Sequence, residues 1–297
     1  MSEPERVAEP ERTAETPWMV DAHHHVWDLS VRDQDWITGD ALAPIRRDFS
    51  LADLLPEARA AKVAATVVVQ TVTVAEETPE LLALAAADPE LVAGVVGWTD
   101  LTRPDVADAL AELCELPGRR YLVGIRHQVQ GERDPRWLLR PDVRRGLKAV
   151  ADTGLAYDLV VLPHQLPACV EAAREHPELT FVLDHLGKPP IASGDLEPWD
   201  AAVRALAALP NTVCKLSGLV TEADPKSWTV EDLRPYADTV LEAFGPDRLM
   251  FGSDWPVCTL EASYGEVVDI ARELTDALSD AERAAVFAGT ATRVYRL

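Results

Sequence analysis

The chain has 297 residues, 47% of them hydrophobic, and carries a net charge of −22 at pH 7. This acidic excess argues against nucleic acid and anionic membrane surfaces as partners, because both are bound through clusters of lysine and arginine. No apolar run approaches the roughly 18 residues of a membrane span. Four scattered cysteines without CxxC spacing predict free thiols in a reducing cytoplasm. We therefore expect a small molecule as the partner.

Residues 1–17 are acidic and almost free of large apolar side chains. This composition predicts a disordered tail, so we expect one folded domain over residues 18–297. From Trp18 onwards, short β-branched runs alternate with stretches rich in Ala, Leu, Glu and Arg. Eight of the runs are nearly all apolar, as parallel strands buried on both faces are. They span residues 20–25, 65–71, 92–98, 122–126, 157–161, 180–184, 212–216 and 248–252.

Helical stretches separate these strands, and several begin at Pro or after Ser, Thr or Asp. They cover residues 51–61, 79–87, 104–115, 141–153, 166–175, 199–209, 229–244 and 264–278, with a last helix over 279–288. Eight strand–helix units in series predict an α/β fold, a single-domain (β/α)₈ or TIM barrel. A doubly wound open sheet is the alternative, although the first strand lacks the Gly-rich turn of its dinucleotide-binding version. Residues 28–48 follow the first strand and are predicted to overhang the barrel mouth as a lid.

Three consecutive histidines end the first predicted strand. Side chains alternate along a strand, so His23 and His25 should share a face with Asp21, while His24 points the other way. A carboxylate and two imidazoles on one face suit a site that binds a metal or transfers protons. We expect His24 to matter least to the chemistry.

Polar residues also follow other strands, at the barrel end where catalysis takes place. Asp254 is predicted to take a proton from water or bind a metal, the alternative being a helix cap. His185 is a candidate ligand, or an acid that stabilises a carbonyl oxygen, unless it only bonds Asp184 at a turn. Arg126 suits bidentate binding of a substrate carboxylate or carbonyl, with a structural salt bridge as the alternative.

Three further residues are predicted to bind substrate and shape specificity. Lys215 lies inside an apolar strand, where an unpaired lysine is costly, so it either faces the site or pairs with an acid. Gln70 ends the second strand, and Glu222 lies in the loop after the seventh.

Five blocks of the sequence, in this order, resemble the amidohydrolase superfamily, and in particular its lactonase branch. That branch includes hydrolases of L-fuconolactone, L-rhamnonolactone and 2-pyrone-4,6-dicarboxylate. The resemblance covers residue 18 to the C-terminus and implies a TIM barrel and hydrolysis. The blocks are DAHHHVWD (21–28), GIRH (124–127), LDHLGKP (183–189), KLSGL (215–219) with Glu222, and GSDWP (252–256).

The resemblance also implies roles for particular residues. His23, His25, His185 and Asp254 match catalytic positions of the family, and Arg126 matches a substrate-binding arginine. It implies that Asp254 activates the attacking water while the histidines stabilise the oxyanion.

The resemblance implies less directly whether the site holds a metal than it implies the roles of these residues. Metal-dependent members of the superfamily usually add a carboxylated lysine on the fourth strand and a histidine on the fifth. Here the fourth strand ends in Arg126, and His164 lies a few residues past the fifth run. This departure favours a site that works without metal. A single divalent ion such as Zn²⁺, held by His23, His25 and Asp254, is the alternative.

The function that we expect is hydrolysis of a lactone, with a sugar lactone as the substrate class. A metal-dependent decarboxylase or another zinc hydrolase on the same barrel is one alternative, and a non-catalytic binding protein is another. The sequence leaves open whether the chain forms a homo-oligomer.

Overall fold

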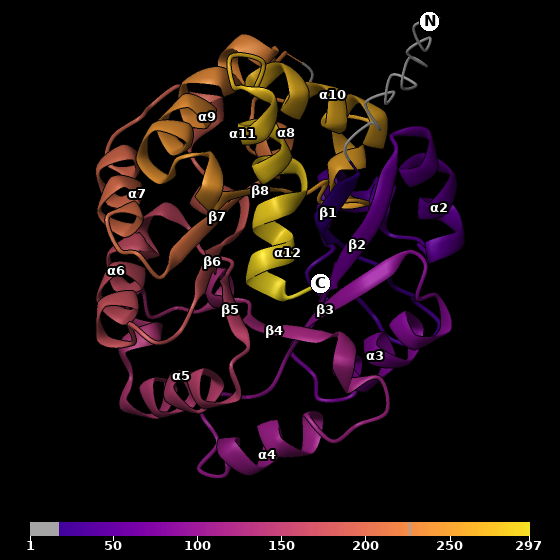
Figure 1. Cartoon of the computed structure of the whole chain (residues 1–297), viewed down its shortest axis with the longest axis vertical. Coiled ribbons are helices and arrows are strands. Elements are labelled where there is room, and N and C mark those ends of the chain that lie inside the picture. Colours follow the sequence, from indigo (N-terminus) through magenta and orange to yellow (C-terminus); the bar gives the residue numbers. More distant parts are fainter. Residues whose placement is uncertain (1–17, 226) are drawn as a thin grey trace, which may run out of the picture.

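The structure is a computed structural model that describes residues 18–225 and 227–297. The predicted acidic tail lies outside these residues. Eight parallel strands form one sheet in sequential order (Figure 1), which confirms the eight predicted strands to within a few residues at each end. They are β1 Met19–His24, β2 Val63–Val69, β3 Val92–Gly97, β4 Leu122–His127, β5 Ala156–Leu159, β6 Phe181–Leu183, β7 Thr212–Leu216 and β8 Leu249–Phe251.

The sheet curls into a nearly closed barrel. Just beyond β8, Trp255 forms a parallel bridge with His24, and the Asp254 amide donates to the His23 carbonyl at 2.8 Å. These contacts join the last strand to the first. The predicted (β/α)₈ barrel is therefore confirmed, and the open doubly wound sheet is wrong.

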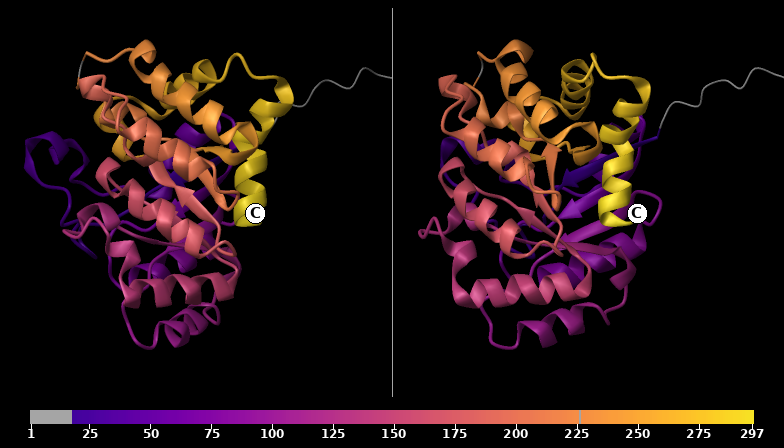
Figure 2. Two further views of the ribbon diagram at one scale, coloured as in Figure 1. Left: turned by 90° about the vertical axis from the view of Figure 1, so that its left-hand side faces the viewer. Right: turned by 60° about the vertical axis from the view of Figure 1, so that its left-hand side comes forward.

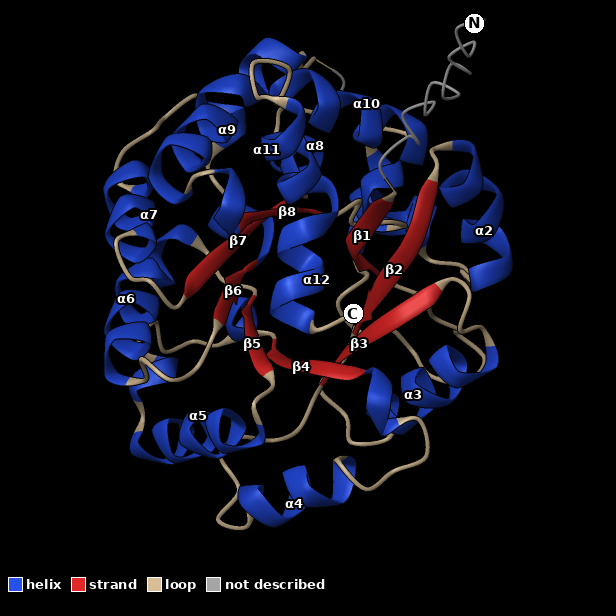
Figure 3. Cartoon of the chain, in the orientation of Figure 1, coloured by secondary structure: helices blue, strands red, loops and turns tan. Residues whose placement is uncertain are grey.

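Helices surround the barrel (Figure 3). Four of them begin at a reciprocal capping box, in which a Ser or Thr and an acid three residues on satisfy free amides; these boxes start at Ser50, Thr229, Ser263 and Ser279. The α-helices are α1 Gly39–Leu42, α2 Leu51–Ala60, α3 Glu77–Ala87, α4 Val106–Leu113, α5 Pro141–Thr153, α6 Leu166–Glu175, α7 Trp199–Ala207, α8 Leu219–Glu222, α9 Val230–Phe244, α10 Tyr264–Leu274, α11 Asp280–Ala284 and α12 Thr290–Tyr295.

Apolar side chains pack in two layers, one between barrel and helices and one inside the barrel. The inner layer is mostly valine from the strands, and it also includes Ala291 and Tyr295 of α12. Leu297 lies against Gly94, close to the beginning of β3. Helix α12 therefore closes the amino-terminal end of the barrel, and the opposite end is left for the site.

The segment after β1 lies on the other side of the barrel from α12, as the side views show (Figure 2). An antiparallel bridge between Trp27 and Phe49 ties its two ends together. This placement agrees with the predicted lid over residues 28–48, whose movement remains a prediction.

Within the described residues, no helix is long and apolar enough to cross a membrane. All four cysteines, which lie in the described part of the chain, are unpaired, as predicted.

Candidate active site

The strand that carries the histidines is irregular. Its pairing with β2 shifts register between Asp21 and His24, as a β-bulge does. The shift breaks the alternation of side chains, so the prediction that Asp21 shares the face of His23 and His25 is wrong.

Asp21 instead supports the turn that follows β8. Its carboxylate accepts hydrogen bonds from the Ser253 amide (2.8 Å), the Ser253 hydroxyl (2.6 Å) and the Tyr264 hydroxyl (3.0 Å). Burial nevertheless raises the pKa of Asp21 to about 6. These contacts fix the backbone next to Asp254.

The middle histidine lies outside the site. His24 is buried, and its Nε2 contacts the Thr66 hydroxyl at 3.0 Å. Its predicted orientation, away from the other two histidines, is therefore confirmed.

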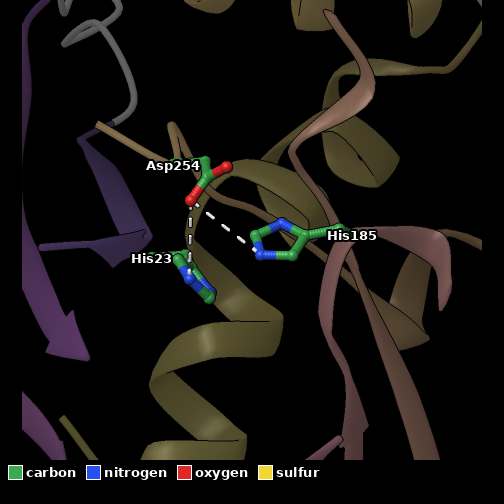
Figure 4. Close-up of side chains that lie close together, drawn as sticks. All are labelled: His23, His185 and Asp254. Carbon is green, nitrogen blue, oxygen red and sulfur yellow. Dashed lines mark ion pairs between the residues drawn. The ribbon is translucent and has the colours of Figure 1, made fainter. Parts of the chain in front are cut away.

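Four side chains converge at the carboxyl ends of the strands (Figure 4 draws three of them). The Nε2 atoms of His23 and His25 are 3.2 Å apart. The Oδ1 atom of Asp254 lies 3.8 Å from Nε2 of His23, 3.6 Å from Nε2 of His25 and 3.9 Å from Nε2 of His185. The structure thus brings the four predicted catalytic residues together around one point.

Hydrogen bonds on the far side of two imidazoles orient them. His25 Nδ1 lies 2.7 Å from the Val69 carbonyl, which only accepts, so Nδ1 carries a proton and Nε2 faces the site. His185 Nδ1 contacts the Ser217 hydroxyl at 2.9 Å, which leaves Nε2 facing Asp254. Outer partners of this kind fix the tautomer and direction of a catalytic or metal-binding histidine.

The third imidazole, His23, has charged neighbours at its Nδ1 atom. Lys215 Nζ lies 3.1 Å away and Asp184 Oδ1 lies 3.4 Å away. A proton on Nδ1 donates to Asp184 and frees Nε2 for a cation, whereas Nδ1 accepting from Lys215 places the proton on Nε2. The tautomer of His23 therefore decides whether Nε2 is a ligand or a donor.

Of the two alternatives that its sequence position left open, the structure shows that Lys215 pairs with acids. It lies behind His23, and its fully buried ammonium pairs with Asp158 at 2.6 Å and with Asp184 at 3.0 Å. It does not line the cleft.

Arg126 is both a cleft residue and a member of a salt bridge. Its Nη1 donates to Asp184 Oδ2 at 3.0 Å, its Nε donates to the Gln70 side chain at 2.9 Å, and its Nη2 donates to the Gln70 carbonyl. Gln70 is fully buried behind the guanidinium. It supports Arg126 and does not itself line the cleft.

The cleft above these residues has a volume of about 80 Å³. Trp36, from the predicted lid segment, forms part of its wall. Glu222 is not among the lining residues, but pairs with Lys188 at 3.1 Å. The lining residues are His25, Trp36, Thr71, Arg126, Gln128, Gln130, Val160, His185, Lys188, Asp254 and Val257.

Sequence reasoning missed two kinds of residue. Asp158 and Asp184 are fully buried acids, and an acid within an apolar strand was a usable signal for Asp158, as it was for Lys215. Gln128 and Gln130 follow β4 as ordinary polar loop residues, and nothing in the sequence singles them out.

Burial sets the charge state of the cluster. It lowers the pKa of His185 to about 4 and, with the nearby Lys215 ammonium, holds the pKa of His23 well below its ordinary value. Burial would raise the pKa of Asp254, but the neighbouring His185, His25 and His23 outweigh it and hold that pKa below its ordinary value. At neutral pH the site therefore holds a carboxylate beside neutral His23 and His185 imidazoles.

The turns that carry two of these residues have an unusual backbone. His185 has φ 52° and Asp254 has φ 57°, in the left-handed region that residues other than glycine seldom adopt. Such conformations concentrate at functional sites.

The absence of a side chain at Gly218 leaves room for the His185 imidazole. Gly218 has φ +67°, and a Cβ there would lie 2.6 Å from His185 Nδ1. We expect Gly218→Ala to displace the imidazole and lower kcat by roughly 100-fold, as misplacement of a catalytic group by about 1 Å does. Gly194→Ala is the matched control, because Gly194 has φ +73° with nothing within 4 Å of the added Cβ. Equal kcat values for the two variants would show that this position of His185 is not needed.

TIM-barrel enzymes have their active sites at the carboxyl ends of the barrel strands. This chain, with its polar side chains at the same end, has the architecture of that class. The amidohydrolase family model matches residues 20–297. The chain belongs to the amidohydrolase family, as the five sequence blocks predict.

Similar proteins include two curated relatives. An L-fucono-1,5-lactonase from Burkholderia multivorans is 43% identical, over 94% of this chain and 96% of the relative. An L-fucono-1,5-lactonase from Burkholderia ambifaria is 40% identical, over 94% of this chain and 95% of the relative. A crystal structure of a Burkholderia multivorans amidohydrolase with bound zinc matches with a TM-score of 0.88 and 40% identity, covering 94% of this chain and 99% of the other.

The donor set fits a divalent ion. One ligand atom from each of His23, His185 and Asp254 lies within 4.8 Å of the others, and His25 Nε2 contacts two of these residues. The predicted single-ion site named His23, His25 and Asp254, while His185 was predicted separately as a candidate ligand. The prediction that the site works without metal finds no support in this donor set or in the zinc-bound relative.

Proposed function

We propose that this chain hydrolyses a sugar lactone at the mouth of its barrel. The observation that carries the proposal is the convergence of three imidazoles on the Asp254 carboxylate, at the floor of a small polar cleft. Relatives named L-fucono-1,5-lactonase, 40–43% identical over almost the whole chain, support lactone opening as the reaction.

Asp254 is the proposed general base. Its carboxylate is ionised at neutral pH, and it takes a proton from the water that attacks the lactone carbonyl carbon. The ring C–O bond then breaks, and Asp254 returns the proton to the leaving alkoxide. The products are a free hydroxyl group and a carboxylic acid, which releases its proton to water at neutral pH and becomes a carboxylate.

Arg126 is proposed to bind the carbonyl oxygen as it becomes negative, and His185 to join it only when its Nε2 holds a proton and no ion. The Arg126 contacts with Gln70 and Asp184 leave one Nη2 hydrogen without a hydrogen-bond acceptor in the described part of the chain. Donors held in place before the reaction stabilise a developing oxyanion without reorganisation.

The cleft lining favours a neutral, hydroxyl-rich ring over a dicarboxylate. Among the described residues, Arg126 is the one arginine that lines the cleft, and the Lys188 ammonium is already paired with Glu222. Gln128 and Gln130 offer amide groups that both donate to and accept from hydroxyl groups. We therefore favour a sugar lactone such as L-fucono-1,5-lactone.

We also propose that the site binds one divalent ion through His23, His185 and Asp254, with His25 as a further ligand. Contacts of 3.2–3.9 Å among these donor atoms compare with about 3.3 Å between ligands of a tetrahedral zinc ion with bonds of about 2.0–2.1 Å. Such an ion polarises a carbonyl and lowers the pKa of bound water.

Chelation tests the metal proposal. Dialysis against a strong chelator is expected to lower the rate of lactone opening at least tenfold, and one equivalent of Zn²⁺ to restore it. Zinc should also raise the melting temperature of the wild-type protein but not that of a His23→Ala/His185→Ala variant, because binding to the folded state alone stabilises it. Full activity in protein shown to be metal-free by elemental analysis would contradict the proposal.

A panel of sugar lactones followed with a pH indicator tests the reaction class. Hydrolysis releases one proton per lactone opened at neutral pH, whereas decarboxylation releases CO₂ and consumes a proton. Proton release on at least one sugar lactone is expected. Carbon dioxide release from an aromatic acid, with no lactone opened, would favour the decarboxylase alternative.

Three further proposals concern the whole protein. We propose a cytoplasmic location from the four unpaired cysteines, and one domain over residues 18–297 with residues 1–17 as a separate acidic tail. A homo-oligomeric state remains a prediction that size-exclusion chromatography with light scattering can test.

A further inference from the structure

Helix α12 enters the barrel from the end opposite the cleft. Figure 3 shows it across the middle of the ring of strands, and the side chain of Tyr295 is buried in the inner layer. The rest of this layer is apolar, apart from one line of charged groups formed by Asp158, Lys215 and Asp184. Tyr295 contacts the Asp158 end of this line.

The Tyr295 hydroxyl donates to Asp158 Oδ2 at 2.7 Å. The same oxygen accepts from Lys215 Nζ at 2.6 Å, and the Lys215 ammonium lies 5.5 Å from the centre of the tyrosine ring. The other oxygen, Oδ1 of Asp158, has no hydrogen-bond partner among the described residues. Tyrosine and lysine together therefore fix the direction of this carboxylate.

Lys215 connects Asp158 to side chains nearer the cleft. The Lys215 ammonium donates to Asp158 Oδ2 at 2.6 Å and contacts His23 Nδ1 at 3.1 Å. It also forms an ion pair with Asp184 Oδ1 at 3.0 Å. Asp184 in turn binds Arg126 at 3.0 Å. Tyr295 is thus connected to both His23 and Arg126 through side chains that are almost fully buried.

Stability does not account for this line of charges. Taking charged groups out of water costs free energy that ion pairing often fails to recover. A protein with apolar residues of similar size in place of a buried ion pair is often as stable, or more stable. Valines such as Val67 and Val182 fill the rest of the inner layer and would fill this space too. The charges are therefore better explained by the residues that they hold at the cleft.

We infer that Tyr295 is a positioning residue of the active site, acting through Asp158 and Lys215 on His23 and Arg126. The inference rests on the proposed function, since it assigns Tyr295 to the same reaction. Without the hydroxyl group, Asp158 loses one of its two donors and its carboxylate is free to turn. The Lys215 ammonium then follows it and leaves its place beside His23 Nδ1.

Tyr295→Phe tests the inference, because it keeps the ring and removes only the hydroxyl. We expect kcat for lactone opening to fall roughly tenfold, the lower end of what loss of an outer contact to a site histidine costs, with KM changed less than twofold. Tyr236→Phe is the matched control: its buried hydroxyl donates to the carbonyls of Pro190 and Asp195, away from this line, so its kcat should not change.

A double-mutant cycle separates positioning from general stability. If Tyr295 acts through Asp158, the variant Tyr295→Phe/Asp158→Asn should have the same kcat as Asp158→Asn alone. In NMR spectra of the imidazole nitrogens, the His23 signals should move in Tyr295→Phe and stay in place in Tyr236→Phe.

The outcomes are distinguishable. Wild-type turnover combined with an unchanged kcat in Tyr295→Phe, or with independent effects in the cycle, overturns the inference and leaves the proposed function standing. No lactone turnover by the wild-type protein overturns the proposed function and this inference with it. A fall in melting temperature without a fall in kcat shows a purely structural tyrosine.

Discussion

Asp254→Asn is expected to lower kcat for lactone opening by about 1,000-fold, within the range that general acid–base catalysis contributes. Asparagine keeps the size of the side chain but cannot take a proton from water. It also removes the negative charge that three imidazoles approach within 3.6–3.9 Å. Substrate contacts through Arg126 are unchanged, so KM should change less than threefold. Steady-state kinetics on the best lactone of the panel provides the measurement.

A control must separate lost chemistry from lost folding. Asp238→Asn changes an exposed acid on α9, and its kinetics should match those of the wild type. Circular dichroism and the melting temperature of Asp254→Asn should show a folded barrel. A variant that keeps more than a tenth of the wild-type kcat would contradict the assignment of Asp254 as the base.

Lys215→Met is expected to have the largest effect on stability. It removes the ammonium between two fully buried carboxylates, Asp158 and Asp184. Breaking a buried ion pair by removing one partner typically costs about 3–5 kcal/mol, because the remaining charge stays uncompensated. We expect urea unfolding to give a loss of this size, together with loss of activity because His23 and Arg126 lose their support.

A double variant tests whether the uncompensated buried charge causes this loss of stability. Lys215→Met/Asp158→Asn removes one of the uncompensated charges, so it should recover part of the lost stability. It should not recover activity, since the contact at His23 Nδ1 remains absent. If Lys215→Met is as stable as the wild type, the Lys215 ammonium does not compensate the buried charges of Asp158 and Asp184.

The barrel was predictable because its strands are buried on both faces. Mostly apolar runs such as residues 65–71 and 92–98 mark β2 and β3 without any need for long-range information. The candidate site residues were predictable for a related reason. Polar side chains at the ends of apolar strands meet at one end of a barrel, and this rule brings His23, Arg126, His185 and Asp254 together.

Side-chain direction was harder to predict. The alternation rule assumes a regular pleat, and the irregular pairing at residues 21–24 sends Asp21 to Ser253 and not to the cleft. Gln70 has the strand-end position of a substrate ligand, yet it bonds Arg126, 56 residues away. Contacts of this kind depend on the positions of neighbouring strands, which a single sequence does not specify.

The line from Tyr295 to His23 shows the same limit. The Asp158–Lys215 pair joins residues 57 positions apart, and the Tyr295–Asp158 contact spans 137. The cost of an unpaired buried lysine indicated that Lys215 needed an acidic partner or the site. Which acid it meets follows from the barrel register and not from local pattern.

The most direct test of the central claim is a ¹³C NMR time course of a sugar lactone with the purified, zinc-supplemented protein at neutral pH. The proposal predicts that the lactone carbonyl signal is replaced by a carboxylate signal faster than in a protein-free sample, with every carbon retained. Ring opening at no more than the spontaneous rate for every lactone tested, or loss of a carbon as CO₂, would contradict it.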